Sequence, residues 1–542
     1  MEILRVENLS FTYAGTKTPV LSDVSFSVEA GQFVTVCGAT GSGKSTLLRM
    51  IKRELTPEGK KSGTISVCGA DQSELTPRDA AEKVGFVFQH PEQQIVCDKV
   101  WHELAFGLEN LGLPRETVRR RVAETACFFG IEDIFRKKTA ELSGGQKQLV
   151  ALASVMAMRP EILLLDEPTS RLDPVASADF TATLKRLSRE TGVTVIIVEH
   201  SLGELIGISD KLLVIDGGKI VDFDAPRSVI SRLSVGDDIV KTLPTAPKIY
   251  LSLGAGGKCP LDVSEGREFI KNNYKNDVRA LENSTESSCD EAAIEMKNVF
   301  FRYSKTDKDA LAGLNLNVKK GEIFSILGGN GSGKTTALCV ASGLYRAFSG
   351  KVKIFGKDVS DYKNQTLYKD CLSMLFQDVQ TVFLKNTVRE ELESVGGRNF
   401  ELPYDISNLY DIHPYDLSGG QQQLVALGKV LLTNPRLLLL DEPTKALDGA
   451  QKERLARVVK DLKSRGVTVV IVTHDTDFAA EISDRCAMFF AGEAISTGTP
   501  REFFSDNGYY TTESSRMTRG YYDGAVTTGD VVSLCKVNGR RE

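Results

Sequence analysis

The sequence has 542 residues, of which 41% are hydrophobic and 26% are charged, and its 67 basic residues nearly balance its 72 acidic ones. A chain of this length is too long for one hydrophobic core, so it predicts two to four domains. The formal net charge of −5 argues against a general nucleic-acid-binding protein, whose surface would be strongly basic. The start of the sequence lacks a signal-peptide pattern and no long apolar run follows, so we expect a chain that does not cross a membrane. Its 10 cysteines form no C-x-x-C pair, which argues against a zinc site or a disulfide framework. We therefore expect the chain to reside in a reducing cytoplasm.

The chain contains an internal duplication. Gly-Ser-Gly-Lys occurs at 41–44 and 331–334, Leu-Ser-Gly-Gly-Gln at 142–146 and 417–421, and Leu-Asp-Glu-Pro-Thr at 165–169 and 440–444. Offsets of about 275 to 290 residues indicate a repeated domain and not a short-period solenoid.

The duplication sets the expected domain boundaries. We predict one domain at 1–234 and a second at 294–505, because the motifs lie within these ranges. Residues 235–293 are expected to form an extension of the first domain plus a linker, since 280–293 is polar and acidic. Residues 506–542 are rich in Thr, Gly and Tyr and are predicted to be a poorly ordered tail, to which we assign no role.

Short apolar runs bounded by turn residues predict buried strands in each copy. These runs are 33–37, 162–165 and 193–198 in the first copy, and 323–327, 437–440 and 467–472 in the second. A helix is predicted around Val118, Val122, Ala126 and Phe129, which fall on one helical face. Such alternation is typical of an α/β fold with a largely parallel sheet.

Each copy contains the pattern G-x-x-x-x-G-K-[ST] between an apolar strand and a predicted helix, at 45–53 or 335–342. The glycines let backbone N–H groups surround phosphates, the lysine reaches the terminal phosphates, and the next hydroxyl suits Mg²⁺. A plain glycine turn is the alternative, which two full matches in context disfavour. The candidate nucleotide-binding residues are Gly38, Gly41, Ser42, Gly43, Lys44, Ser45 and Thr46, and Gly328, Gly331, Ser332, Gly333, Lys334, Thr335 and Thr336.

Two adjacent carboxylates follow an aliphatic strand in each copy, where burial would be costly unless they served an ion or a reaction. The first carboxylate suits Mg²⁺ and the second suits polarising the attacking water, while a histidine at the end of the next strand could contact the γ-phosphate. A single strand-end histidine is usually incidental, but its recurrence favours a function. The residues are Asp166, Glu167 and His200 in the first copy, and Asp441, Glu442 and His474 in the second.

The two Leu-Ser-Gly-Gly-Gln segments, together with both phosphate-loop patterns, resemble the signature of ABC ATPases. The resemblance covers nearly all of residues 1–232 and 294–505. It implies two P-loop NTPase domains of the ABC type, each with a mixed or parallel sheet core and a helical subdomain, that bind and hydrolyse ATP with Mg²⁺. It also implies that Gln89 and Gln377 contact the metal and relay to a membrane partner. Tyr13 and Tyr303 would stack on adenine, with a buried strand tyrosine as the alternative.

The same resemblance implies that the two halves pair head to tail within the chain around two ATP molecules. The signature residues Ser143, Gly144, Gly145 and Gln146 would complete the site of the second half, and Ser418, Gly419, Gly420 and Gln421 that of the first. Neither half lacks a catalytic group, so we expect both sites to turn over. The chain departs from the family pattern at Leu149 and Leu424, where an arginine is common, and at Lys445, where the first half has Ser170.

The segment from Gln89 to Ile95, Gln-His-Pro-Glu-Gln-Gln-Ile, and the Phe-Gly-Leu-Glu-Asn run at 106–110 resemble the Q-loop region of energy-coupling-factor importers. Residues 237–270 resemble the C-terminal extension of those ATPases. The second copy keeps only Thr-Val-Arg-Glu-Glu-Leu at 387–392, and its interval from Gln377 to Ser418 is shorter, so the halves are expected to contact a partner asymmetrically. The expected partners are a transmembrane coupling subunit and a membrane substrate-capture subunit for a vitamin or metal ion, at the cytoplasmic face of a prokaryotic cell membrane.

Two other functions compete with this interpretation. A sugar-type ABC importer can also use a tandem ATPase chain, but the Gln-His-Pro-Glu segment favours the energy-coupling-factor importer. A soluble ABC protein acting on ribosomes or DNA would need a basic arm, metal-binding cysteines or a large insertion, whereas 280–293 is acidic. The basic run at 119–121 is expected to be a solvated helix face, so no nucleic-acid partner is predicted.

Overall fold

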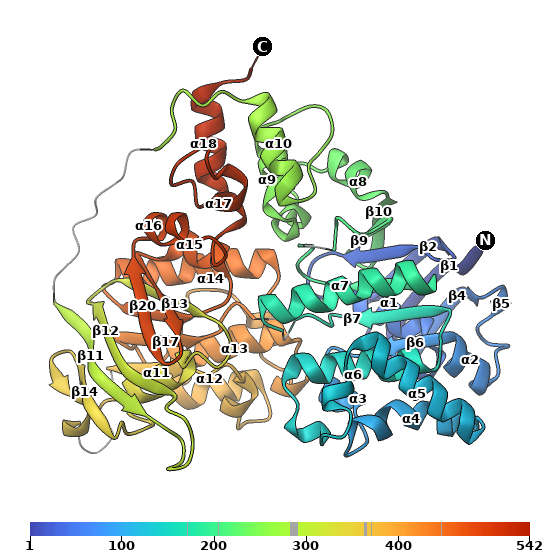
Figure 1. Ribbon diagram of the computed structural model, residues 1–542, viewed down its shortest axis with the longest axis horizontal. Helices are drawn as coiled ribbons and strands as arrows, with labels where there is room; N and C mark the ends of the chain where they lie inside the picture. The colour runs from blue at the N-terminus through green and yellow to red at the C-terminus, as the bar shows by residue number, and fades with distance from the viewer. Residues whose placement is uncertain are drawn as a thin grey trace. The chain divides into compact units, whose positions relative to one another are not determined.

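The computed structural model describes residues 1–170, 172–203, 205–281, 291–362, 366–369, 371–445 and 447–541 (Figure 1). They divide into two compact units. The first comprises Met1–Pro244 and Gly256–Asp262, and the second comprises Thr245–Ala255 and Val263–Glu542. Most of the predicted linker at 280–293 lies outside the described residues.

The first unit contains two sheets. The smaller one is antiparallel between its paired strands and has the order β2-β1-β4-β5; the larger has the order β10-β9-β3-β8-β7-β6 and is parallel except between β9 and β10. The strands are β1 (Glu2–Tyr13), β2 (Leu21–Glu29), β3 (Phe33–Cys37), β4 (Gly59–Val67), β5 (Ala70–Asp71), β6 (Val84–Val87), β7 (Ile162–Asp166), β8 (Thr194–Val198), β9 (Lys211–Asp216) and β10 (Lys219–Asp224). Every residue of β3, β7 and β8 is buried, which explains their continuous apolar sequences.

The helices of the first unit surround this sheet and build a helical region between β6 and β7. They are α1 (Lys44–Ile51), α2 (Pro77–Lys83), α3 (Pro91–Gln94), α4 (Val100–Asn110), α5 (Arg115–Phe129), α6 (Gly144–Ala157), α7 (Pro174–Thr191) and α8 (Pro226–Arg232). Helix α5 buries Val118, Val122, Ala126 and Phe129, as their spacing predicts, and leaves Arg119 exposed. It ends at Gly130, whose left-handed φ of 63° closes the helix.

The second unit repeats the two sheets with the orders β12-β11-β14-β15 and β16-β17-β18-β13-β19-β20. Its strands are β11 (Ala292–Phe301), β12 (Leu311–Lys319), β13 (Ile323–Gly328), β14 (Ser349–Ile354), β15 (Lys357–Asp358), β16 (Leu372–Leu375), β17 (Leu437–Asp441), β18 (Thr468–Val472), β19 (Arg485–Phe490) and β20 (Glu493–Gly498). Its outer helices are α11 (Lys334–Ala341), α12 (Val388–Gly396), α13 (Gly419–Leu431), α14 (Gly449–Ser464), α15 (Thr476–Ile482) and α16 (Pro500–Asp506). The described residues between α12 and α13 contain no α-helix matching α5, because this interval is shorter.

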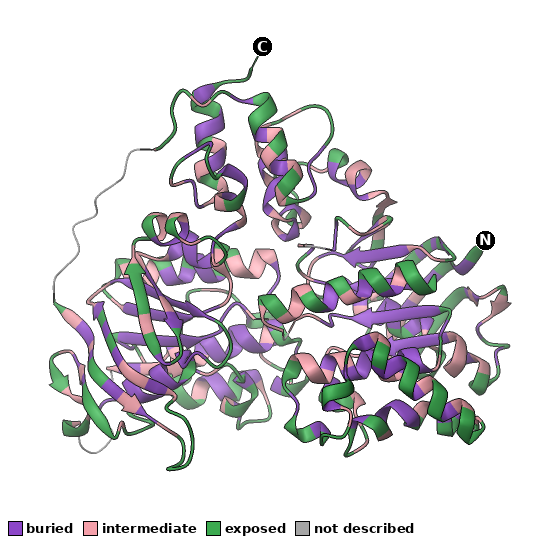
Figure 2. Ribbon diagram, viewed as in Figure 1, coloured by how far each residue is buried: buried purple, intermediate pink, exposed green. Residues whose placement is uncertain are grey.

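The predicted α/β class is confirmed, since all six predicted strands occur within a residue or two of the expected bounds. Figure 2 shows the buried strands of each unit as continuous purple arrows between more exposed helices. Within the described part of the chain, no helix combines the length and the apolar character that crossing a membrane requires.

The expectation of a poorly ordered tail at 506–542 is wrong. This segment forms α17 (Glu513–Thr518) and α18 (Thr528–Asn538), which pack with α9 (Thr245–Ser252) and α10 (Val263–Asn273) inside the second unit (Figure 1). The four helices share their own apolar core, including Ile249, Ile270, Met517 and Leu534. The short apolar stretches of the tail are too brief to show a helical period, yet they are buried once α9 and α10 supply a partner face.

The core of these four helices can be tested with paired alanine substitutions on α18. Leu534 is fully buried, whereas Val537 on the same helix is 62% exposed. We expect Leu534→Ala to cost about 2 to 5 kcal/mol of unfolding free energy, because it leaves a cavity in a packed core. Calorimetry should show a lower melting temperature for Leu534→Ala and an unchanged one for Val537→Ala. Equal melting curves would contradict a packed tail.

Candidate functional site

The phosphate-loop pattern forms the same strained turn in both units. Gly38 and Gly328 have φ values of 149° and 151°, and Gly43 and Gly333 have values of 98° and 99°. A Cβ at Gly38 would lie 1.9 Å from the carbonyl oxygen of Ile215, and one at Gly328 would be similarly blocked. Side chains cannot occupy these positions, so the glycines are required for the loop to pass over the end of the sheet.

The lysine of each loop is folded over its own turn. The Nζ of Lys44 donates to the carbonyl oxygens of Gly38 and Ala39 at 2.8 and 2.9 Å. Lys334 makes the matching pair of bonds, both at 2.9 Å. Both side chains are buried, which holds a positive charge at the N-terminus of α1 or α11, where phosphate oxygens would bind.

The first strand-end carboxylate of each unit faces the hydroxyl that follows the lysine. Ser45 donates to Oδ1 of Asp166 at 2.7 Å, and Thr335 is hydrogen-bonded to Asp441. Burial raises the pKa of Asp166, and it raises that of Asp441 to about 6. The Oδ1 of Asp441 is buried without a hydrogen-bond partner among the described residues. A hydroxyl beside a buried carboxylate with an unsatisfied oxygen fits the oxygen ligands of Mg²⁺.

The second carboxylate of each pair sits in a strained backbone conformation. Glu167 and Glu442 have φ values of 47° and 52°, in the left-handed region that non-glycine residues rarely occupy. The amide of Glu167 donates to the carbonyl of Val198 at 3.0 Å, and that of Glu442 donates to Val472 at 2.8 Å. The neighbouring strand therefore holds each glutamate at the carboxyl edge of the sheet, as expected where strain serves a function.

A histidine faces each of these glutamates. The Nε2 of His200 lies 2.6 Å from Oε1 of Glu167, and the Nε2 of His474 lies 3.0 Å from Oε1 of Glu442. All four side chains are largely buried. The structure thus brings the predicted carboxylates and histidines together within each unit.

The two Q-loop glutamines differ in their surroundings. Gln89 donates to Oε2 of Glu167 at 2.7 Å and to the hydroxyl of Ser170 at 3.3 Å. Gln377 is exposed and makes no hydrogen bond with the other described residues. The contact between Gln89 and Ser170 could not be predicted from the duplication, because the second unit has Lys445 at the position of Ser170.

The signature segments form helix N-termini on the surface of each unit. Ser143 and Gln146 cap α6 reciprocally, with bonds of 3.0 and 3.3 Å, and Ser418 and Gln421 cap α13 in the same way. The glutamines therefore have a structural role, while the exposed Gly144 has open space where a Cβ would project. Backbone N–H groups at such a helix start are suited to an anion.

The two candidate adenine-binding tyrosines have equivalent positions. The Tyr13 hydroxyl lies 2.9 Å from that of Thr46, and the Tyr303 hydroxyl lies 2.8 Å from that of Thr336. Tyr303 is 60% exposed, so it is not a buried strand tyrosine. Each ring is thus tied to the phosphate-loop helix through its hydroxyl, and stacking on adenine stays a prediction.

Glu199 lies beside the first site, and no motif in the sequence points to it, because the second copy has Thr473 at this position. It is buried and accepts hydrogen bonds from the backbone and hydroxyl of Thr169 at 2.9 and 2.7 Å. Burial raises its pKa to about 7. The second unit has Thr473 here, bonded to Thr444, so the two halves carry different polar groups next to the histidine.

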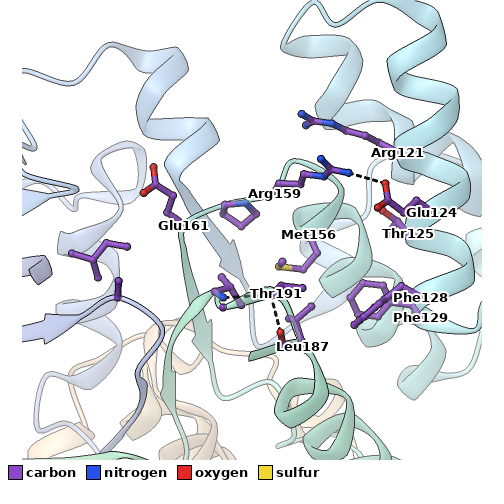
Figure 3. Close-up of a pocket in the computed structure, with 15 residues that line it drawn as sticks. Arg121, Glu124, Thr125, Phe128, Phe129, Met156, Arg159, Glu161, Leu187 and Thr191 are labelled. Carbon is purple, nitrogen blue, oxygen red and sulfur yellow. Dashed lines mark hydrogen bonds and ion pairs between the residues drawn. The ribbon is translucent and has the colours of Figure 1, made fainter. Parts of the chain in front are cut away.

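A separate cavity lies in the first unit where α5, the end of α6 and the end of α7 meet (Figure 3). It has a volume of about 460 Å³ and is lined by Phe128, Phe129, Met156 and Leu187, among others. Arg159 at its edge pairs with Glu124. None of the candidate nucleotide-binding residues lines it, so the predicted site is an open edge of the sheet and not this cavity.

Comparison with known proteins gives one family match in each half of the chain. The sequence matches the family described as "ABC transporter" over residues 21–170 and again over 311–445. It is 37% identical to a putative ABC transporter ATP-binding protein of Bacillus anthracis, over 98% of both chains. It is 32% identical to one of Methanosarcina mazei, over 93% of this chain and 90% of that one. A solved structure, cbiO1 from Clostridium perfringens, described as part of the ABC transporter complex cbiONQ, shares 32% identity over 43% of this chain and 91% of that chain, with a TM-score of 0.40.

Replacing both strained glutamates should abolish turnover while leaving nucleotide bound. We expect Glu167→Gln/Glu442→Gln to reduce ATP hydrolysis by roughly 10²- to 10⁴-fold, because the amide cannot accept the proton of the attacking water. Steady-state phosphate release and ATP binding would be measured on the purified chain. Glu190→Gln/Glu401→Gln, at two exposed positions, is the matched control. Undiminished hydrolysis in the first pair would remove both glutamates from the mechanism.

Proposed function

Because the chain belongs to the ABC transporter family of ATP-binding proteins, we propose that it is the tandem ATPase subunit of an importer of the energy-coupling-factor type. The family hydrolyses ATP, so this chain is an ATPase. The proposed cargo is a vitamin or a transition-metal ion that other subunits select. A relative that matches over 98% of both chains carries both halves in one polypeptide, which supports a tandem ATPase subunit.

In the proposed mechanism, each unit holds the phosphates of one ATP over its phosphate loop. Ser45 and Asp166, or Thr335 and Asp441, would hold Mg²⁺, which would supply positive charge against the phosphates. Gln89, which donates to Glu167, and the exposed Gln377 would also contact the metal, as the family resemblance implies. Glu167 or Glu442 would then orient a water molecule and accept its proton.

Glu167 and Glu442 are the proposed general bases. Each carboxylate lies at the carboxyl edge of the sheet, next to the phosphate loop and its partner aspartate. His200 and His474 face these carboxylates and would interact with the terminal phosphate as its charge develops. The chemistry is transfer of the γ-phosphoryl group to water.

We infer that the chain binds two ATP molecules, and that the signature of each half completes the ATP site of the other half. Ser143 and Ser418 are exposed at the starts of α6 and α13, whose first turns present backbone N–H groups and carry no acidic side chain. Placing each helix start against a γ-phosphate would satisfy those N–H groups and add positive potential. Binding of ATP would then favour a closed pair, and hydrolysis would release it.

The observation that carries the importer proposal is an exposed apolar segment after Gln89. Val96, Trp101 and Phe106 are 68%, 40% and 38% exposed, although they belong to the most hydrophobic residue types. The segment is held in place by Glu103, which is buried and accepts hydrogen bonds from the backbone of Val96 and Cys97 at 3.0 and 2.8 Å. An exposed apolar segment next to a Q-loop, with two of its backbone amides bonded to Glu103, suits a short helix of a membrane subunit.

The second unit presents a different surface at the equivalent place. Leu384 is 80% exposed there, and the buried Glu391 accepts from the backbone of Leu384 and Lys385 and pairs with Lys429 at 2.6 Å. The same device, a buried glutamate bonded to two backbone amides, thus supports a smaller apolar group. Two unlike surfaces suit a coupling subunit with two unlike helices.

Purification of the tagged chain from its native membranes tests the importer proposal. We expect small, very hydrophobic membrane proteins to co-purify, and Trp101→Glu to lose them because a charge would be placed in the apolar contact. Val221→Glu introduces the same charge at a residue that is 64% exposed elsewhere in the first unit. It should retain the partners.

The identity of the captured proteins separates the alternatives. Ribosomal proteins in place of membrane subunits would contradict the importer and support the soluble ABC class. Large membrane subunits accompanied by a sugar-binding protein would support the sugar-type importer. Equal capture by Trp101→Glu and the unchanged chain would show that this segment is not the docking surface.

A further inference from the structure

The imidazole rings of the two halves differ at the nitrogen that faces away from the glutamate. In the second unit, Nδ1 of His474 lies 3.4 Å from the hydroxyl of Tyr510. In the first unit, Nδ1 of His200 is buried and no described residue provides it with a hydrogen-bond partner. The histidine–glutamate pair itself is present in both halves, so this contact distinguishes two otherwise equivalent pairs.

We propose that Tyr510, from the segment leading to the C-terminal helices, is a positioning residue that fixes the orientation and tautomer of His474 in the second ATP site. Nε2 of His474 faces the carboxylate of Glu442, which favours a proton on Nε2. Nδ1 is then the acceptor, and the hydroxyl of Tyr510 donates to it. The inference rests on the proposed role of His474 at the terminal phosphate.

Tyr510 is itself held firmly by the second unit. Its ring packs against the apolar cluster that contains Leu327 of β13, Ala479 of α15 and Phe504 of α16. The next residue, Thr511, is buried and donates its hydroxyl to the carbonyl oxygen of Phe504. These contacts hold the ring of Tyr510 in place, so its hydroxyl has a defined position next to the histidine, as a positioning group requires.

The same segment is tied to α9. Thr512 caps α17, and the first residue of that helix, Glu513, accepts a hydrogen bond from the backbone amide of Thr245 at 2.9 Å. Lys248 of α9 interacts electrostatically with Glu513 and with Asp477, which lies three residues after His474. The four-helix core therefore connects to the residues around His474 through Tyr510 and through these charges. The residues that follow β10 in the first unit include none that reaches His200 in this way, as far as the structure describes them.

Substitution of Tyr510 by Phe removes only the hydroxyl. We expect it to lower turnover at the second site by about 3- to 10-fold, the loss typical of one hydrogen bond, with an unchanged KM. Because the first site still turns over, the kcat of the whole chain should fall by at most about 2-fold. Tyr509→Phe is the matched control, because Tyr509 is 99% exposed. In a His200→Ala background, where the second site carries the remaining turnover, Tyr510→Phe should reduce kcat by the full 3- to 10-fold, and in a His474→Ala background it should add nothing.

Histidine labelled with ¹³C at ε1 gives a readout that does not depend on turnover. The full chain contains five histidines, and the signal lost in His474→Ala identifies the one of interest. That signal should shift in Tyr510→Phe and stay in place in Tyr509→Phe, with the other four unchanged. An unmoved signal would overturn the proposal even if the Glu→Gln pair confirms ATP hydrolysis. A lowered kcat that persists in the His474→Ala background would assign Tyr510 a different role.

Discussion

In each half, the candidate site depends on strained backbone conformations at the carboxyl edge of one parallel sheet, in the phosphate loop and at the glutamate that follows β7 or β17. The phosphate loop turns over this edge on glycines that no other residue can replace, and the adjacent strand ends in an aspartate followed by a glutamate in a left-handed conformation. The amide of Glu167 remains bonded to the neighbouring strand, so the strain is borne by the sheet. At this edge the hydroxyl of Ser45 lies 2.7 Å from Asp166, and each glutamate lies 2.6 or 3.0 Å from its histidine.

Much of this arrangement could be predicted from the sequence. The strands were identifiable because buried parallel strands are continuously apolar, and the motifs occupy their ends in the same order twice. The tail could not be predicted, because its helices are stable only against α9 and α10, which lie more than 200 residues earlier in the sequence. The contact between Tyr510 and His474 was equally hidden, since it joins two segments that no motif relates.

The duplicated halves have diverged in what surrounds the glutamate–histidine pairs, and not in the pairs themselves. Gln89 reaches Glu167 whereas Gln377 is exposed, and Glu199 of the first half corresponds to Thr473 of the second. The surfaces next to the two Q-loops also differ, since the second half lacks an α5 equivalent among its described residues. These differences are what two ATPase domains would need if they contact one asymmetric partner and are regulated separately.

A cryo-EM structure of the Glu167→Gln/Glu442→Gln chain with ATP and Mg²⁺ tests the central claim most directly. The account predicts two trapped ATP molecules, each held by the phosphate loop of one half and by the signature serine of the other, Ser418 or Ser143. Nucleotides contacted by a single half, with both signature helices directed away from the phosphates in every class of particle, would contradict it.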